Sequence, residues 1–426
     1  MIYMDIYECI NPCKSPKSAG YMNLRENFIN ICPMTSIDKD IFENTAVAFA
    51  PKTNTELQKA KWLFSLIGNN KLVSLGTSLA DLALKLHLPI SPLFRISVYQ
   101  HFCGGESFDE CKQTIAKLKK NKVYAMLNYG VELKEREEDF DKTIEKNIEA
   151  LEFAGQNKDV KVLCIKITGF GRFGLFEKMQ EGKKLSKEEK TELDRVKDRL
   201  DMLCQSAVSN DVSIYVDAEE SWIQNPLDSM VEEVMAIYNK KKAVVFNTLQ
   251  LYRWDRLDYL HQQLDLAKSK GYMLGVKLVR GAYMEKERER AAANGYKSPI
   301  NKDKPSVDKD FNAAMNLCLD HLDHVSVCIA SQSEESNMLA IKQIDAKKID
   351  RKHPHILFSQ LYGMGDNITF NLADLGFNAC KYLPYGPVKD VIPYLIRRAQ
   401  ENTSVSGQMG RELRLLTIEI ARRKKR

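Results

Sequence analysis

The segment VKVLCIKITG, residues 160–169, is a short run of apolar and β-branched side chains that ends on polar residues. Charged amphipathic segments flank it, which is typical of a buried strand in a parallel sheet. Seven further runs repeat the pattern: KVYAMLNYG near 122, VSIYVDAE near 212, AVVFNTLQ near 243, GYMLGVKLV near 271, VSVCIA near 325, HILFSQL near 355 and ACKYLPY near 379. Eight strands alternating with helices in about 300 residues are what a (β/α)8 barrel requires. We therefore predict an α/β fold of that kind.

The polar and less usual residues fall late in these runs. The carboxyl ends of the strands of a (β/α)8 barrel converge on one rim, where active sites lie. We therefore expect the functional site on that rim. The residues concerned are Asn128, Lys166, Asp217, Glu219, Gln250, Lys277, Ser331, Gln360 and Tyr382.

The first part of the chain shows the spacing of helices rather than of strands. The segments TELQKAKWLFSLIG and SLADLALKLHL place apolar residues three and four apart. We expect an N-terminal helical arm over residues 1–115, a barrel domain over residues 116–415 and a basic C-terminal tail over residues 416–426. The tail ends in ARRKKR, which fits a solvated end better than a contact with an anionic membrane surface.

The composition is that of an ordinary globular protein, with 44% apolar and 28% charged residues. Its 63 basic and 57 acidic residues leave a formal net charge of +6, which is too small to call for a nucleic-acid partner. Ten cysteines without a CxxC pair predict neither a zinc site nor a disulfide framework. The DHLDH segment at 320–324 fits a solvated helix face better than a metal site, so we expect no metal.

The sequence also bears on the compartment. Asp5 and Glu8 lie where a signal peptide would be basic, so export is not expected. The longest apolar stretch, residues 72–94, is interrupted by polar and charged side chains and cannot cross a bilayer as a helix. We expect a cytoplasmic protein with reduced thiols. A peripheral position on the inner face of a membrane is the alternative, and in a eukaryote the expected compartment is the mitochondrial matrix.

Tyr394, Arg397 and Arg398 lie three and four residues apart in PYLIRRAQEN, so they project from one face of a predicted helix. Two guanidinium groups just after the last strand suit a small anionic substrate, because they hold a carboxylate through paired, charge-assisted hydrogen bonds. Adjacent arginines alone also fit a solvated surface helix. The surrounding motif decides between these interpretations.

That motif is KYLPYGPVKDVIPYLIRRAQENTS, and with GVKLVRGAYMEKERERA at Gly275 it strongly resembles the proline dehydrogenase family. Shorter matching pieces occur in the same order along the chain. They are MLNYGVE at 126, KITG at 166, YVDAEES at 215, FNTLQLY at 246, ASQSEES at 330 and FSQLYGMGD at 358. The resemblance covers roughly residues 40 to 415.

The resemblance implies a distorted (β/α)8 barrel that holds FAD noncovalently and oxidises L-proline to Δ1-pyrroline-5-carboxylate, with electrons passed to a membrane quinone. It implies that Arg397 and Arg398 bind the proline carboxylate, and that Lys166 and Asp217 complete the polar network. Three further residues, Leu278, Tyr382 and Tyr394, would pack on the pyrrolidine ring. Such an apolar wall suits a ring that offers no other polar handle.

The same resemblance implies a set of cofactor contacts. Lys277 would lie near the flavin N5 atom, Gln250 on the pyrimidine edge and Glu401 at the adenosine ribose. A cation beside the reduced, anionic flavin stabilises the developing charge, while the redox chemistry belongs to the flavin. The full set of implied cofactor residues is Gln250, Lys277, Arg280, Gly281, Ala282, Tyr283, Ser331, Gln332 and Glu401.

Two positions depart from the family pattern. Gln332 and Ser333 stand where relatives commonly have a His-Asn pair, which affects the expected contact with the FAD phosphates and adenine. Asn128 stands where an Asp is usual, and its neutral side chain would weaken an ion pair behind the site, with altered tuning expected before loss of activity.

Two other functions stay open at this point. A hydroxyproline dehydrogenase would share the fold and the cofactor, but that branch tends to have a smaller residue where Tyr382 stands. A flavin-free barrel that only binds a ligand would make the rim residues coincidental, and it would be colourless. The GFGRFG stretch at 169–174 matches a dinucleotide-binding pattern but lacks the acidic residue on a second strand that the pattern requires.

Overall fold

The computed structural model describes residues 41–67, 98–130, 135–392, 394–396 and 408–425. Within them, eight parallel strands close into a barrel in sequence order, and β8 pairs with β1. The strands are β1 Val123–Tyr129, β2 Val160–Ile165, β3 Ser213–Val216, β4 Val245–Gln250, β5 Leu274–Val279, β6 Val325–Ala330, β7 Ile356–Leu361 and β8 Ala379–Tyr385. Each strand lies in one of the eight runs, so the predicted (β/α)8 barrel is confirmed.

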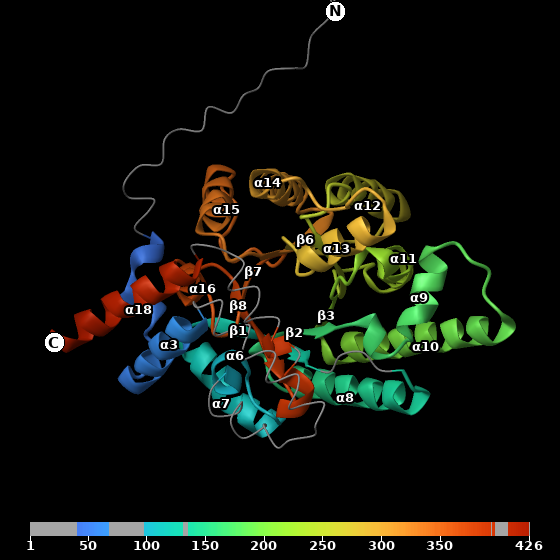
Figure 1. The fold of residues 1–426 in the computed structure, drawn as a ribbon. Coiled ribbons are helices and arrows are strands. Elements are labelled where there is room, and N and C mark those ends of the chain that lie inside the picture. The colour runs from blue at the N-terminus through green and yellow to red at the C-terminus, as the bar shows by residue number, and fades with distance from the viewer. Residues whose placement is uncertain (1–40, 68–97, 131–134, 393, 397–407, 426) are drawn as a thin grey trace, which may run out of the picture.

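Helices surround the barrel and cover its outer face (Figure 1). A capping box begins the longest described helix, α10: Ser186 accepts from the Glu189 backbone, and Glu189 accepts from the Ser186 backbone. The helices are η1 Ile41–Glu43, α2 Thr45–Ala48, α3 Asn54–Ile67, α6 Gln100–Phe102, α7 Phe108–Lys120, α8 Glu137–Gly155, η3 Ile167–Gly169, α9 Phe173–Gln180, α10 Lys187–Asn210, α11 Ser221–Tyr238, α12 Arg256–Lys270, α13 Met284–Asn294, α14 Lys304–Asp320, α15 Glu334–Ala346, α16 Asp366–Asp374 and α18 Gln408–Lys424.

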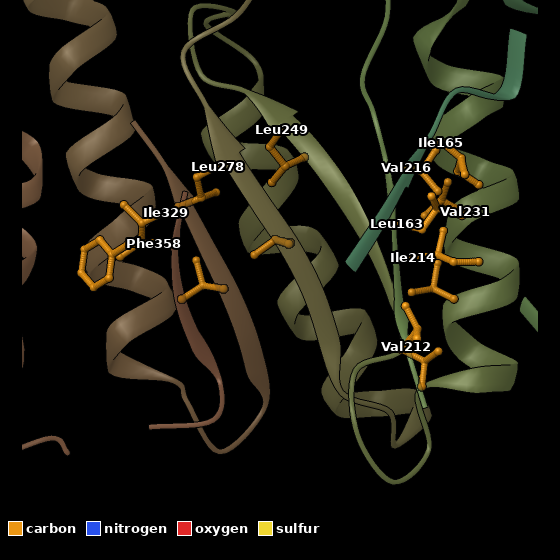
Figure 2. Close-up of a cluster of buried hydrophobic side chains, with 14 of the residues drawn as sticks. Leu163, Ile165, Val212, Ile214, Val216, Val231, Leu249, Leu278, Ile329 and Phe358 are labelled. Atoms are coloured by element: carbon orange, nitrogen blue, oxygen red, sulfur yellow. The ribbon is translucent and has the colours of Figure 1, made fainter. Parts of the chain in front are cut away.

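The two faces of each strand belong to two different cores, because successive side chains point to opposite sides. The outward residues, among them Leu163, Leu249 and Ile329, pack with apolar residues of the surrounding helices (Figure 2). Inward residues such as Cys164 and Phe246 fill the barrel interior. Strand alternation therefore decides which rim residues can reach the site.

A third core lies outside the barrel, between the N-terminal helices and the C-terminal helix. Leu57 and Phe64 of α3 are buried there with Leu415 and Leu416 of α18, and α18 lies beside α3 (Figure 1). The segment from residue 416, predicted as a solvated tail, is instead the second half of α18. The reason is its apolar stripe: those leucines are buried against α3 although the residues that follow are basic.

The basic end of α18 is also tied down. Arg422 and Arg423 both pair with the buried Glu419, and Arg423 also donates to the Phe49 carbonyl at 2.8 Å. These two arginines at the end of α18 are therefore engaged in contacts within the protein. None of the described helices is both long and apolar enough to cross a membrane.

The charged stretch from Glu285 to Asp310 is mostly helical. It contains most of α13 and the start of α14, joined by a short segment that begins at Gly295. The Asp303 side chain caps α14 by accepting from Ser306 N at 2.9 Å. Local capping and ion pairs support these helices, although the stretch has few apolar residues.

Leu416→Ala should lower the free energy of unfolding by about 2 to 5 kcal/mol, because it leaves a cavity between α18 and α3. Leu416 is 1% exposed, whereas Ile418 on the same helix is 40% exposed, so Ile418→Ala is the matched control and should cost far less. Urea unfolding followed by circular dichroism measures both. Equal, small losses would show that α18 does not pack on α3.

Candidate active site

The centre of the rim is a largely buried carboxylate, with a side chain 13% exposed, that holds two side chains from distant strands. Asp217 follows β3, Lys277 lies on β5 and Tyr382 on β8. The Lys277 ammonium group is paired with Asp217 Oδ1, and Tyr382 Oη donates to Asp217 Oδ2 at 2.9 Å. The same ammonium group lies 5.4 Å from the centre of the Tyr382 ring. The structure therefore brings these three predicted residues together.

Burial and charge fix the protonation states of this cluster. Burial alone would lower the pKa of Lys277, but the Asp217 carboxylate outweighs burial and holds that pKa above its usual value. Burial, with a smaller contribution from Asp217, raises the pKa of Tyr382 well above its usual value. A charged lysine and a neutral phenol therefore flank the carboxylate.

Lys166 and Tyr283 form a second contact on the rim. Lys166 directly follows β2, and Tyr283 directly precedes α13. Lys166 Nζ donates to Tyr283 Oη at 3.2 Å and lies 5.9 Å from the centre of the Tyr283 ring. The structure thus places a predicted substrate residue against a predicted cofactor residue.

Gln250, the last residue of β4, joins two neighbouring loops. Its Nε2 donates to the Glu219 carbonyl at 2.8 Å, and its Oε1 accepts from Ala282 N at 3.1 Å. The chain at Gly281 adopts a φ of +143°, and a Cβ there would lie 2.5 Å from the Tyr252 ring. Glycine is therefore required where the chain leaves β5 and passes close to Tyr252.

Arg280 links the loop after β5 to the loop after β6. Its guanidinium group donates to Asp308 Oδ1 at 2.8 Å, to Ser331 Oγ at 2.7 Å and to Ser336 Oγ at 2.9 Å. Ser331 Oγ in turn accepts from Ser333 N at 3.1 Å. Ser331 and Arg280, which are both predicted to contact the cofactor, are therefore joined by a hydrogen bond.

The two residues at the family's His-Asn position have local roles in the structure. Ser333 caps α15 by accepting from Ser336 N at 3.2 Å. Gln332 Nε2 lies 4.0 Å from Met364 Sδ, a weak contact with the loop after β7. The structure therefore gives Ser333 a structural function in starting α15, and it places Gln332 beside the next loop.

The remaining predicted substrate residues are not all brought to this cluster. Leu278 alternates with Lys277 and lies in the outward core with Leu249 and Ile329 (Figure 2), so the structure does not bring it to the side of β5 that carries Lys277. Tyr394 is buried in the core between α3 and α18, against which Tyr382 also packs. The predicted residues Arg397, Arg398 and Glu401 lie outside the described residues.

Glu219, which the sequence places on the rim without a specific role, is buried beside the cluster. Its Oε2 accepts from Thr168 Oγ1 at 2.5 Å and its Oε1 from Thr168 N at 3.3 Å. Burial raises its pKa to about 7, although the nearby Lys166 opposes that shift. Its place two residues after Asp217 in the same run was the available clue.

Lys381 was missed altogether, because strand patterns rarely carry a buried lysine. It is fully buried and faces away from the barrel interior, with Nζ 2.8 Å from Asp366 Oδ1. It also donates to the Met364 carbonyl at 2.5 Å. Lys52 reaches the other oxygen of Asp366 at 3.0 Å. This cluster holds the loop after β7 in place.

The donors of the described rim suit a flavin ring in their chemistry. Thr248 is buried on β4, on the same side as Gln250, and its Oγ1 has no hydrogen-bond partner in the part of the chain that the structure describes. It lies in register with Lys277. An amide, a hydroxyl group and a cation are the donors that a flavin ring accepts from, and Arg280 supplies a further cation nearby.

Comparison with known proteins finds sequences that are similar to most of this chain. The family model described as proline dehydrogenase matches residues 111–411. A carbapenem antibiotics biosynthesis protein, CarD, of Pectobacterium carotovorum subsp. carotovorum is 33% identical over 81% of this chain and 89% of its own length. The mitochondrial proline dehydrogenase 1 of Dictyostelium discoideum is 30% identical over 89% of this chain and 74% of its own. Hydroxyproline dehydrogenase of Xenopus laevis is 30% identical over 77% and 78%.

Solved structures give the same fold at lower identity. Proline utilization A from Bdellovibrio bacteriovorus, inactivated by N-propargylglycine, superimposes with a TM-score of 0.66 at 19% identity over 89% of this chain. The alignment spans 39% of that longer protein. A Bradyrhizobium japonicum proline utilization A variant gives a TM-score of 0.61 at 19% identity over 74% of this chain and 32% of its own. At these identities the comparison supports the barrel alone.

Asp217→Asn should lower the free energy of unfolding by about 3 to 5 kcal/mol, because it leaves the buried Lys277 ammonium group without its partner. The double variant Asp217→Asn with Lys277→Met should recover most of that loss. Urea unfolding of the flavin-free protein measures both. Glu233→Gln, which removes a charge from an exposed pair with Lys197, is the control and should change little. A single variant as stable as the unmodified protein would contradict the ion pair.

Proposed function

We propose that this chain, which belongs to the proline dehydrogenase family, is an FAD-dependent oxidoreductase that converts L-proline to Δ1-pyrroline-5-carboxylate. The observation that carries the proposal is the largely buried Asp217 carboxylate, which fixes Lys277 and Tyr382 against each other on the rim. Related proteins carry names from proline, hydroxyproline and carbapenem chemistry, so the choice of substrate is argued from the site.

In the proposed reaction, L-proline loses a hydride from C5 and a proton from its nitrogen, and the bond between these atoms becomes a double bond. Bound FAD would supply the acceptor of that hydride. The protein's own part is to bind the ring, orient C5 and exclude water. No protein nucleophile is required for these steps.

The described residues divide this work between two sides of the site. Lys277 stays protonated beside Asp217, so it offers a fixed positive charge where negative charge develops on the cofactor. Gln250, Arg280 and Ser331 would hold the cofactor by hydrogen bonds. The implied contacts of Gly281, Ala282, Tyr283, Gln332 and Glu401 with the cofactor belong to the same proposal.

Tyr382 would form the wall against the pyrrolidine ring. Its hydroxyl group is held by Asp217 at 2.9 Å, so the ring cannot swing aside without breaking that hydrogen bond. A rigid wall favours proline over hydroxyproline, because an added ring hydroxyl would meet the tyrosine ring with no polar partner there. Lys166 and the pair Arg397 and Arg398 would bind the substrate carboxylate. Packing roles for Leu278 and Tyr394 stay predictions from the resemblance.

The electrons would then pass to a quinone, which is a membrane-borne acceptor. We therefore expect the protein to work against the inner face of a membrane, in a bacterial cytoplasm or in a mitochondrial matrix. The mitochondrial names of eukaryotic relatives support the second compartment only for a eukaryotic source.

Anaerobic mixing of the FAD-loaded protein with L-proline should bleach the oxidised flavin absorbance, because the substrate delivers two electrons to it. Trans-4-hydroxy-L-proline should bleach it far more slowly, owing to the fixed Tyr382 ring. Stopped-flow absorbance measures both rates. Faster bleaching by hydroxyproline would favour the hydroxyproline activity, and a colourless protein that cannot be loaded with flavin would favour a binding barrel.

Arg398→Ala should weaken L-proline binding by about 2 to 5 kcal/mol, because a charge-assisted hydrogen bond to the carboxylate is lost. FAD should remain bound. Spectroscopic titration and the flavin content of the purified variant measure these two quantities. Loss of flavin with unchanged proline binding would assign the arginine to the cofactor instead.

A further inference from the structure

Hydrogen bonds join the ends of four consecutive strands into a closed circuit, which we call the rim ring. Thr168, after β2, donates to the Glu219 carboxyl group after β3. The Glu219 carbonyl accepts from Gln250 at the end of β4. Gln250 accepts from Ala282 after β5. The rim ring consists of Lys166, Thr168, Glu219, Gln250, Ala282 and Tyr283.

The last contact of the rim ring returns to its start. Tyr283 follows Ala282 directly, and its hydroxyl group accepts from Lys166 Nζ at 3.2 Å. Lys166 lies two residues before Thr168. The loops after β2, β3 and β5 and the end of β4 therefore constrain one another, and the positions of Lys166, Gln250 and Tyr283 depend on the same circuit.

The main chain of Glu219 is held in place by a series of hydrogen bonds from α11. Its backbone N–H donates to Gln224 Oε1 of α11 at 2.7 Å, and Gln224 Nε2 donates to Asp228 Oδ1 at 2.8 Å. Asp228 is in turn paired with Arg256 at 2.6 Å. The residue is only 3% exposed. The main chain at Glu219 is therefore fixed, and its buried carboxyl group extends from a fixed point toward Thr168.

The hydrogen bonds of the Glu219 carboxyl group in the described part of the chain both go to Thr168. Its two oxygens accept from the hydroxyl group and the backbone N–H of Thr168. A side chain with two acceptor atoms is needed to satisfy both donors, because a buried group without a hydrogen-bond partner is destabilising. This pair of bonds is the link between the loop after β2, which carries Lys166, and the loop after β3.

We propose that Glu219 is a positioning residue of the reaction: its carboxyl group locks Thr168 and thereby holds Lys166 and its partner Tyr283 in place. The inference rests on the proposed function, which puts Lys166 beside the substrate carboxylate and Tyr283 along the cofactor. Glu219 acts through these residues and needs no contact with either ligand.

The test compares three variants of the FAD-loaded protein. Glu219→Ala removes both acceptors and should raise KM for L-proline by about tenfold or more, as expected for a loss near 1.4 kcal/mol. It should also shift the visible absorption band of the bound flavin. Glu219→Gln can still accept from the Thr168 N–H and donate to its hydroxyl group, so it should restore most of both properties. Thr168→Val should resemble Glu219→Ala in direction.

A matched control and a thermal scan complete the experiment. Glu233→Gln carries the same chemical change on an exposed ion pair with Lys197 and should leave KM, the flavin spectrum and the melting temperature unchanged. Should Glu219→Ala fail to fold, Thr168→Val provides the same comparison, because it removes only the hydroxyl group at nearly constant size.

Three results would overturn the inference. They are an unchanged KM and spectrum in Glu219→Ala, an equal loss in Glu219→Ala and Glu219→Gln, and changes that follow only a lowered melting temperature. Failure of the proposed function is separable from these, because it would appear as flavin in the unmodified protein that L-proline does not reduce. The spectra of the variants would still report whether Glu219 positions Tyr283.

Discussion

The site depends on one largely buried carboxylate. Asp217 lies between Lys277 and Tyr382, which come from strands on other sides of the barrel. A charge that is taken out of water must be paired and hydrogen-bonded, and this requirement fixes the protonation of the lysine and the orientation of the tyrosine together. Asp217 therefore keeps the positive charge of Lys277 in place on the proposed cofactor side, and it keeps the Tyr382 ring in place on the proposed substrate side.

A second cluster of charged residues, which is buried outside the barrel, holds the loop after β7 in place, as Asp217 holds Lys277 and Tyr382 on the rim. The Asp366 carboxylate is paired with Lys381 of β8 and with Lys52 from the N-terminal region. Burial alone would raise the pKa of Asp366, but the two lysines outweigh burial and hold it well below its usual value. Glu412 of α18 accepts from Gly365 N at 2.6 Å. Both ends of the described chain thus support the loop after β7.

The fold was readable from the sequence because strand runs and late polar residues are local patterns. The cluster of Asp217, Lys277 and Tyr382 was predictable as a group on one rim, but its bonding was not, since side-chain pairing depends on barrel closure. Leu278 shows where prediction from a motif fails. The family motif predicts that it contacts the substrate, whereas the alternation of side chains along β5 turns it outward. Lys381 and the packing of α18 depend on contacts between distant segments, which periodicity does not encode.

The most direct test is a crystal structure of the FAD-loaded protein with a saturated five-membered-ring carboxylic acid that lacks the amine and cannot be oxidised. The expected result is a ring in van der Waals contact with Tyr382, whose hydroxyl group still donates to Asp217, and a carboxylate within hydrogen-bonding distance of Lys166 or of the arginine pair. A ligand bound away from Tyr382, or an Asp217 that no longer pairs with Lys277 in that complex, would contradict the assignment of this rim as the active site.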